Sequence, residues 1–451
     1  MRRSDVAVVG CGYVGLTTAT CLAHLGHLVR ATDVDRTRVE LLSSGRSPLL
    51  EPGLADLLAE GLAAGRLSFG TDNRQAAGSA DFVFLCVQTP PRPDGHLDTR
   101  ALEAVAREIG PVLRPGAVVL SKSTCPLGSN ARVRELLGRG DVSVVTNPEF
   151  LREGSAVKDF LEPDRVVIGA DDIAAAELVA ALFAGVGGAR IITDPTSAEL
   201  VKYAANAFLA TKVTFANSLA ALCEAFGADV GDVAAAVGAD RRIGAGFLAP
   251  GPGFGGSCLP KDTVALAAAA RERAEPFELL ETVTRLNERQ RLLVAGRVAE
   301  LAGGSLDGRL VALWGLTFKA GTDDLRDSPA LDVARCLEVA GARVRAFDPA
   351  VGDVGRLAPL GLDAEVCADR YEACRGAAVL VVATEWPQFA RSDWEAVGRA
   401  MAARRVVDAR NVLDPAELAR HGFEYAGIGI SRRAPSATTG SALPGDERGR
   451  A

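Results

Sequence analysis

The 451-residue sequence lacks the features that mark several classes of protein. Its nine cysteines are dispersed, with no CxxC pair and no Cys/His group at the spacing of a zinc site. We therefore expect reduced thiols, a cytoplasmic location and no bound metal. No apolar run is long enough to cross a bilayer, and the run near the N-terminus is broken by Asp5 and by glycines. Neither a membrane span nor a signal peptide is therefore expected.

Basic residues are not in excess, because 50 Lys and Arg against 57 Asp and Glu give a net charge of −7. A mildly acidic chain lacks the basic field that general nucleic-acid binding needs, so no nucleic-acid partner is expected. Lysine itself is scarce and occurs only at positions 122, 158, 202, 212, 261 and 319. Where the chain keeps Lys, a compact ammonium could be needed in place of a planar guanidinium, and chance is the alternative.

The sequence does contain apolar runs that alternate with helical patterns. Hydrophobic residues make up 48% and charged residues 24%, as in ordinary globular proteins, and the length predicts about three structural units. The first set of runs lies at residues 6–9, 28–32, 82–87, 118–120, 142–145, 166–168 and 190–192. The second set lies at residues 310–314, 344–347, 378–383 and 406–407. Between them, a long Ala-rich helix is predicted from Ser197 to about Phe226, and further helices follow.

This order predicts an α/β fold with two Rossmann-like, doubly wound domains, each built on a parallel sheet and joined by a long central helix. We expect the first α/β domain at residues 1–196, a helical domain at 197–302 and the second α/β domain at 303–431. Residues 432–451 are polar and rich in proline and glycine, which is typical of a disordered tail.

A GxGxxG motif, Gly10-Cys11-Gly12-Tyr13-Val14-Gly15, lies between the first predicted strand and its helix. The first glycine permits a tight turn, the second lets a pyrophosphate approach the backbone, and the third allows close packing of helix on strand. Asp33 ends the second strand 23 residues after Gly10, where an acid that binds ribose hydroxyls is expected. The segment predicts a dinucleotide site, and Asp33 favours NAD over NADP, although Arg36 or Arg38 could bind a 2′-phosphate.

A glycine-rich loop over residues 250–262 carries a cysteine. Pro260 suits the first turn of a helix and places Cys258 just before the helix N-terminus. We expect the helix dipole and the adjacent Lys261 to lower the pKa of this thiol and so to favour a nucleophilic thiolate. Asp262 could orient a water or a base. The alternative is a buried, inert cysteine.

Other polar residues are placed for proton transfer or charge stabilisation. Lys202 and Asn206 lie four residues apart on the long helix, so they project from one face, where they could stabilise an oxyanion. Glu149 and Glu153 follow a strand, and one of these carboxylates could exchange protons with water or substrate. Thr124 also follows a strand and could hold a water. The alternative in each case is an ordinary solvated surface.

Together these motifs resemble the nucleotide-sugar 6-dehydrogenase family, from residue 6 to about residue 430. The matching stretches are GCGYVG, SPLLEPGL, VQTP, KSTCPLGS, NPEFLREG, KYAANAFLATKVTFAN, RIGAGFLAPGPGFGGSCLPKD, GLTFKAGTDDLRDSP, TEW and DARNVLDP. The resemblance implies oxidation of a sugar C6 alcohol to an aldehyde, a thiohemiacetal, a thioester and finally a carboxylate, with two NAD and one water consumed. The stretches TEW and DARNVLDP favour UDP-glucose as substrate and UDP-glucuronate as product.

The resemblance also implies roles for individual residues. Cys258 would be the nucleophile, and Lys202 and Asn206 would stabilise the oxyanion. Asp262 and Thr124 would hold the water, with Glu149 as a further partner of that water, and Glu153 would act as acid/base in thioester hydrolysis. At the NAD site the residues are Gly10, Gly12, Tyr13, Val14, Gly15, Asp33, Arg38, Thr89, Thr124, Glu153 and Arg326. At the substrate they are Glu149, Phe150, Leu151, Lys202, Asn206, Phe254, Gly255, Lys319, Arg410 and, from a neighbouring subunit, Arg242.

By the same resemblance, the first α/β domain binds NAD and the second, which has no GxGxxG, binds the UDP-sugar. The helical domain forms a homodimer or a higher homo-oligomer along its long helix. Uronic acids made by such enzymes supply surface polysaccharides. One departure is Cys125, where the family more often has Val.

Three alternatives remain open. A GDP-mannose 6-dehydrogenase would share the mechanism. A two-electron hydroxy-acid dehydrogenase would also use a Lys-x-x-x-Asn pair, but it would need neither Cys258 nor a third domain. A non-catalytic NAD-binding protein would need none of the thiol, Lys, Asn and carboxylates together. Enzymes for N-acetylamino sugars are disfavoured because they typically carry His at the position of Ser257.

Overall fold

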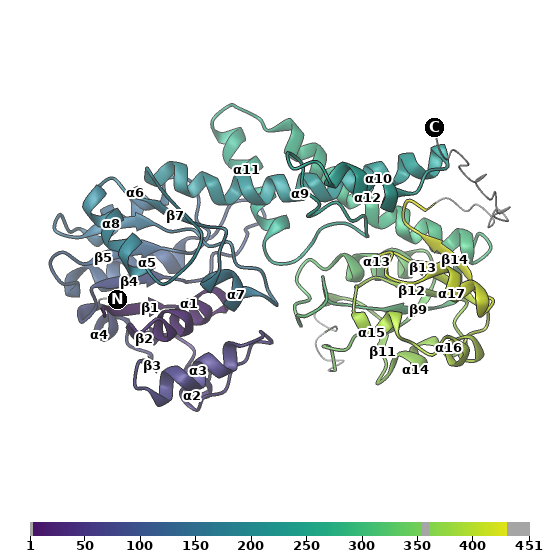
Figure 1. Ribbon diagram of the computed structural model, residues 1–451, viewed down its shortest axis with the longest axis horizontal. Helices are drawn as coiled ribbons and strands as arrows, with labels where there is room; N and C mark the ends of the chain where they lie inside the picture. Colours follow the sequence, from purple (N-terminus) through teal and green to yellow (C-terminus); the bar gives the residue numbers. More distant parts are fainter. Residues whose placement is uncertain (1–2, 353–356, 358–359, 431–451) are drawn as a thin grey trace, which may run out of the picture.

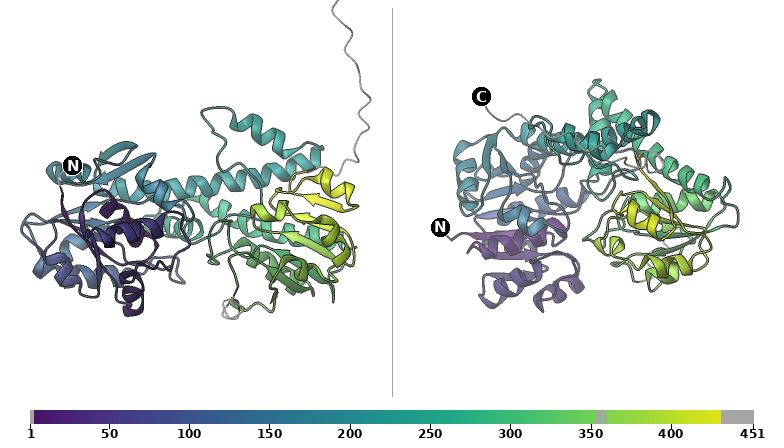
Figure 2. Two further views of the ribbon diagram at one scale, coloured as in Figure 1. Left: turned by 60° about the horizontal axis from the view of Figure 1, so that its bottom comes forward. Right: turned by 45° about the vertical axis from the view of Figure 1, so that its right-hand side comes forward.

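The structure, a computed structural model, describes residues 3–352, 357 and 360–430. The predicted disordered tail at 432–451 lies outside these residues. Two α/β units lie towards opposite ends of the long helix α9 (Pro195–Phe226), which runs along one side of both (Figures 1 and 2). The predicted fold class is therefore confirmed, and α9 matches the Ala-rich helix predicted from the sequence.

The first unit is built on an eight-stranded sheet with the order β3-β2-β1-β4-β5-β6-β7-β8. Its strands are β1 (Asp5–Val9), β2 (Leu28–Thr32), β3 (Leu67–Gly70), β4 (Phe82–Leu85), β5 (Val118–Ser121), β6 (Ser143–Thr146), β7 (Arg165–Gly169) and β8 (Ala189–Thr193). The parallel arrangement holds from β1 to β6, but β6 and β7 pair antiparallel through Thr146 and Gly169. The chain between these two strands therefore starts and ends at the carboxyl edge of the sheet and keeps the segment with Glu149 and Glu153 there.

Helices cover both faces of this sheet, and the side chains of each strand alternate between two cores. In β1, Val6 and Val8 belong to one core, and Ala7 and Val9 belong to the other. The first face is covered by α1 (Tyr13–His24), α3 (Leu54–Ala63), α7 (Ala156–Leu161) and α8 (Ile173–Leu182), the second by α4 (Asn73–Gly78), α5 (Arg100–Ile109) and α6 (Ser129–Leu137). Burial on both faces explains why the strands read as continuous apolar runs. The remaining elements of this unit are α2 (Arg36–Ser43) and the short 3-10 helix η1 (Gly110–Val112).

The second unit repeats the strand order of the first six strands, as β11-β10-β9-β12-β13-β14. Its strands are β9 (Leu310–Trp314), β10 (Arg343–Phe347), β11 (Glu365–Val366), β12 (Val379–Val382), β13 (Arg405–Asp408) and β14 (Glu424–Gly427). Its helices are α13 (Pro329–Val339), α14 (Arg370–Cys374), α15 (Pro387–Ala390), α16 (Trp394–Ala400) and α17 (Pro415–Arg420).

The central helices connect the two units. They are α9, α10 (Val230–Gly238), α11 (Leu259–Glu272) and α12 (Glu278–Leu301). Helix α12 contributes Val294, Val298 and Leu301 to the core on one face of the second sheet, so the central helices and the second unit share a core. Among the residues that the structure describes, no helix is both long and apolar enough to span a bilayer.

Candidate active site

The glycine motif forms the turn between β1 and α1. Gly10 has a positive φ of 96°, and a Cβ there would lie 2.6 Å from the carbonyl oxygen of Cys86. A Cβ on Gly15 would lie 1.8 Å from the carbonyl oxygen of Gly10, so only glycine lets α1 pack on the turn. A Cβ on Gly12 would meet nothing within 4 Å. The space over Gly12, beside the N-terminus of α1, therefore fits the pyrophosphate of a dinucleotide.

Asp33 lies directly after β2 and is 9% exposed. Its carboxylate accepts a 2.8 Å hydrogen bond from the backbone N–H of Cys11 and a 3.3 Å contact from the Arg38 guanidinium. The carboxylate of Asp33 is thus fixed beside the glycine turn, where it can accept hydrogen bonds from ribose hydroxyls. The hydroxyl of Tyr13 donates to Glu51 and accepts from the backbone N–H of Gly154, next to Glu153.

Cys258 is the N-cap residue of α11, as predicted, but its pKa is raised rather than lowered. Burial is the main cause, and the charge of Glu149 adds to it. The expected help from Lys261 is absent because its ammonium donates at 2.6 Å to Asp262. The cation that does lower the pKa of the thiol is Lys202. The prediction of a lowered pKa was wrong because desolvation by burial outweighs the attraction of Lys202.

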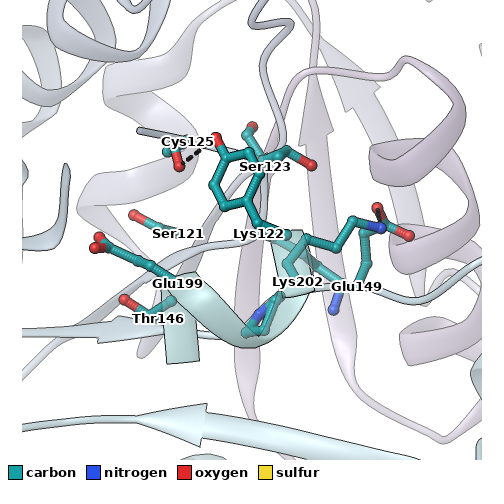
Figure 3. A pocket seen from close by; sticks show the side chains of 11 residues that line it. Ser121, Lys122, Ser123, Cys125, Thr146, Glu149, Glu199 and Lys202 are labelled. Atoms are coloured by element: carbon teal, nitrogen blue, oxygen red, sulfur yellow. Dashed lines mark hydrogen bonds and ion pairs between the residues drawn. The ribbon is translucent and has the colours of Figure 1, made fainter. Parts of the chain in front are cut away.

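Lys202 and Glu149 form a buried ion pair. The Lys202 ammonium donates at 2.7 Å to the Glu149 carboxylate, and both side chains are 6% exposed (Figure 3). Burial would lower the pKa of Lys202 and raise that of Glu149, but their mutual attraction reverses both shifts. Both groups are therefore charged at neutral pH. This burial excludes the alternative of a solvated polar stripe on α9.

Asn206, one turn further along α9, contacts a second carboxylate, that of Asp262. Its side-chain amide donates to Asp262 at 2.5 Å, and Asp262 is completely buried. The face of α9 predicted from the four-residue spacing thus joins two charged pairs next to Cys258, Lys202 with Glu149 and Asp262 with Lys261. Such a site can stabilise negative charge that develops on an oxygen.

Glu153 lies where the two α/β units meet. Its carboxylate accepts from the hydroxyl of Ser257 at 3.0 Å, from that of Thr322 at 3.2 Å and from the Arg326 guanidinium at 3.3 Å. Burial, with a contribution from the nearby Asp324, raises the pKa of Glu153 to about 7. A carboxyl group with this pKa can accept and release a proton near neutrality.

A pocket beneath α9 gathers several predicted residues. It is lined by Ser121, Lys122, Ser123, Thr124, Cys125, Thr146, Pro148, Glu149, Glu199, Lys202 and Tyr203 (Figure 3). The backbone carbonyl of Thr124 accepts at 2.6 Å from the hydroxyl of Thr89, so these two residues are held together. Thr124 and the Lys202–Glu149 pair therefore line the same pocket.

The residues predicted for the substrate come from all three parts of the chain. The backbone N–H of Leu151 donates to Glu149 at 2.7 Å, and Phe150 lies 5.7 Å below the ammonium of Lys202. Phe254 is buried, and a Cβ on Gly255 would lie 2.2 Å from the carbonyl oxygen of Asp327.

Three basic residues complete the predicted set. The half-buried Arg410 donates to the carbonyl oxygens of Phe318 and Ala383, both at 2.9 Å, and so ties β13 to the loop with Lys319. Burial lowers the pKa of Lys319, while Glu153 opposes this shift. Arg242 is not brought to the site, since its side chain is 88% exposed and pairs with Asp240 at 2.6 Å.

Sequence reasoning assigned no role to three buried charged residues of the site. Glu51 accepts from the backbone N–H groups of Gly154 and Ala156, at 2.7 and 2.8 Å. Glu199 accepts from the N–H groups that begin α6. Lys122 donates to Asn147 at 2.9 Å and lies within 6.0 Å of three phenylalanine rings. Two features of the sequence could have indicated these residues. The scarcity of lysine draws attention to Lys122, and the stretch SPLLEPGL contains Glu51.

Known proteins resemble the chain along nearly all of its length. The models of the UDP-glucose/GDP-mannose dehydrogenase family match in order: the NAD binding domain at residues 4–186, the central domain at 196–289 and the UDP binding domain at 312–415. A UDP-glucose 6-dehydrogenase of Rhizobium meliloti is 44% identical, covering 94% of this chain and 99% of its own. One of Pseudomonas aeruginosa is 43% identical, covering 95% and 98%.

A solved structure shows the same similarity in three dimensions. The UDP-glucose dehydrogenase from the hyperthermophilic archaeon Pyrobaculum islandicum is 39% identical and superposes with a TM-score of 0.87. The similarity covers 95% of this chain and 98% of that one. It therefore includes both α/β units and the helices between them.

Proposed function

The chain belongs to the UDP-glucose/GDP-mannose dehydrogenase family and carries its NAD binding domain, and from this we propose that it oxidises UDP-glucose to UDP-glucuronate. The observation that carries the proposal is Cys258 at the start of α11, within electrostatic reach of the Lys202–Glu149 pair. A two-electron alcohol dehydrogenase has no use for a thiol at this place. As part of the proposal, the chain has the three domains predicted from the sequence, and the UDP-sugar binds to the second α/β unit.

The reaction removes two hydrides from one carbon. The glycine turn at residues 10–15 and Asp33 would hold NAD, which when bound would supply a hydride acceptor for each of the two oxidations. Overall, one C6 alcohol, two NAD⁺ and one water give one carboxylate, two NADH and three protons. In the first oxidation the alcohol loses its proton and a hydride to become an aldehyde. The Lys202 ammonium and the Asn206 amide stabilise the oxygen while its negative charge develops.

The thiol of Cys258 then adds to the aldehyde. The new C–S bond gives a thiohemiacetal, whose oxygen faces the same ammonium and amide. Because the pKa of the free thiol is raised, its proton must leave as the C–S bond forms, and the proton passes to the aldehyde oxygen, which becomes the hydroxyl of the thiohemiacetal. Loss of the second hydride, and of the hydroxyl proton, turns the thiohemiacetal into a thioester on Cys258.

Water finally hydrolyses the thioester. Asp262 and Thr124 hold this water, and the Glu153 carboxylate takes its proton while the C–S bond breaks and the thiol is restored. A pKa of about 7 suits Glu153 to this exchange at neutral pH.

A homodimer is part of the proposal. Phe208, Phe215 and Leu222 lie seven residues apart on α9 and are 64%, 53% and 55% exposed. Residues at this spacing lie along one face of a helix, and exposed apolar stripes of this kind mark protein–protein contacts. A second copy would cover the stripe and supply Arg242 to the neighbouring site.

The test counts NADH formed per sugar consumed, with UDP-glucose and, in parallel, GDP-mannose. We expect two NADH per UDP-glucose, and little steady turnover in Cys258→Ser. Two NADH from GDP-mannose alone would keep the mechanism and replace the substrate. One NADH per sugar that does not depend on Cys258 would overturn the four-electron reaction.

A further inference from the structure

The segment Thr384-Glu385-Trp386, which follows β12, contacts the loop at residues 315–320 through each of its three side chains. The Thr384 hydroxyl donates to the Thr317 carbonyl at 2.6 Å, and Glu385 accepts from the Ala320 N–H at 3.3 Å. The indole N–H of Trp386 lies 3.2 Å from the Thr317 hydroxyl. The segment thus holds the loop that presents Lys319.

Asp348 is the second support of this loop. It is 2% exposed, and one of its carboxylate oxygens accepts from the N–H groups of Leu316 and Thr317, at 2.7 and 3.0 Å. The same oxygen accepts from the Thr317 hydroxyl at 2.9 Å and from the Trp386 indole at 3.1 Å. A carboxylate with this many donors fixes the backbone around it.

The place of Asp348 in the sheet explains this arrangement. Phe347 pairs with Trp314 as Thr32 pairs with Val9, so Asp348 and Asp33 occupy equivalent positions directly after the second strand of each unit. In the first unit this acid lies beside an open glycine turn. In the second unit the equivalent acid accepts from the Leu316 N–H, as Asp33 accepts from the Cys11 N–H, and it accepts in addition from the Thr317 N–H and an indole. The second unit therefore uses the acid to shape a loop.

We propose that Trp386, acting through Asp348 and Thr317, is a positioning residue that holds Lys319 in place for the nucleotide sugar. The inference rests on the proposed function, because it assigns Lys319 to the substrate. Arg410 holds the loop from the other side through the carbonyl of Phe318, at 2.9 Å. With both sides fixed, the Lys319 ammonium is presented without the entropy cost of ordering the loop on binding.

The test compares Trp386→Phe with Trp394→Phe. The first variant keeps an aromatic ring but loses the N–H that reaches Asp348, whereas Trp394 is a buried indole of the same unit that packs on Trp314 and Phe423. We expect Trp386→Phe to raise the KM for UDP-glucose about tenfold, as for loss of one hydrogen bond to a charged group, and to leave the KM for NAD within about twofold. Trp394→Phe should change neither KM.

A double-mutant cycle distinguishes positioning from general damage. If Trp386 acts through Lys319, Trp386→Phe should have little further effect on the KM for UDP-glucose in a Lys319→Ala background. An unchanged KM for UDP-glucose in Trp386→Phe, a parallel rise of both KM values, or full additivity with Lys319→Ala would each overturn the inference. Absence of UDP-glucose binding and oxidation in the unsubstituted protein would instead overturn the proposed function, and the inference with it.

Discussion

The charge of Cys258 depends on two neighbours that act in opposite directions. Lys202 lowers the pKa of the thiol, while burial and Glu149 raise it, and the sum is a raised pKa. The thiol is therefore protonated in the free protein at neutral pH. In this state the nucleophile is protected from oxidation and alkylation, since only the thiolate reacts readily.

The rate at which iodoacetamide alkylates Cys258 should change in the directions that these two charges predict. At pH 7.5, Glu149→Gln removes a negative charge and should lower the pKa of the thiol, so the alkylation rate should rise about three- to tenfold. Lys202→Met removes the positive charge and should slow alkylation by a similar factor. Mass spectrometry of the Cys258 peptide measures both, with the exposed Glu177→Gln as the control. Equal rates in all four proteins would contradict the electrostatic account.

The raised pKa of Glu153 predicts a pH dependence. Because the carboxylate is the active base, kcat should rise with pH and level off above about 7, where Glu153 has lost its proton. Glu153→Gln cannot take up a proton, so its kcat should be at least about 100-fold lower and lack this limb. Steady-state rates from pH 5.5 to 9 measure the profile. If the kcat of Glu153→Gln rose with pH about the same midpoint, this pH dependence would belong to another group.

For individual residues, the sequence predicted which side chains share a face better than it predicted their charge states. Lys202 and Asn206 were predicted to share a face of one helix, and they do. Their carboxylate partners, Glu149 and Asp262, lie 53 and 56 residues away in sequence, so the pairing depends on the tertiary fold. Desolvation of Cys258 also comes from the fold, which is why a local argument from the helix dipole gave the wrong sign.

Among the elements, the turn between β1 and α1 has two glycines with different functions. Gly15→Ala would place a Cβ 1.8 Å from the Gly10 carbonyl, so α1 must move, at a cost of about 1–3 kcal/mol or more. Gly12→Ala meets no protein atom within 4 Å and should leave the thermal midpoint almost unchanged. It should nevertheless raise the KM for NAD at least about tenfold, because its methyl group occupies the pyrophosphate space.

Thermal unfolding and NAD titration of the two variants check this contrast. A lowered midpoint in Gly15→Ala together with intact stability in Gly12→Ala is the expected pattern. Normal NAD affinity in Gly12→Ala would show that the cofactor lies elsewhere.

Elements buried on both faces were the predictable ones. Strands such as β4, β5 and β12 are fully buried and read as apolar runs. The strands that sequence reasoning missed are β3, β11 and β14, which have two to four residues and lie at sheet edges, where one side is open and the apolar pattern is weak. The antiparallel pairing of β6 and β7 left no signal, because periodicity does not encode strand direction.

For the whole molecule, the exposed stripe on α9 predicts the oligomeric state. Phe215→Glu places a charge in the middle of the stripe and should convert a dimer of about 94 kDa (2 × 46.8) into a monomer. Light scattering after size-exclusion chromatography measures the mass. Leu178→Glu, on the equally exposed surface of α8, should leave the dimer intact. A dimer that survives Phe215→Glu would exclude this face as the interface.

Arg242 then decides whether each site is completed by its neighbour. Cys258→Ser and Arg242→Ala are each expected to be nearly inactive as homodimers. When the two proteins are mixed and exchange subunits, a heterodimer contains one site with an intact Cys258 from one chain and an intact Arg242 from the other. About half of a random mixture is heterodimer with one of its two sites active, so about a quarter of full activity should return.

If Arg242 acted within its own chain, every site in the heterodimer would lack either the thiol or the guanidinium, and no activity would return. The exposed position of Arg242 favours the first outcome, because a side chain that is 88% exposed and pairs with Asp240 at the surface can be covered by a second copy. Light scattering of the mixture confirms that dimers persist, so that failure to complement cannot be attributed to dissociation.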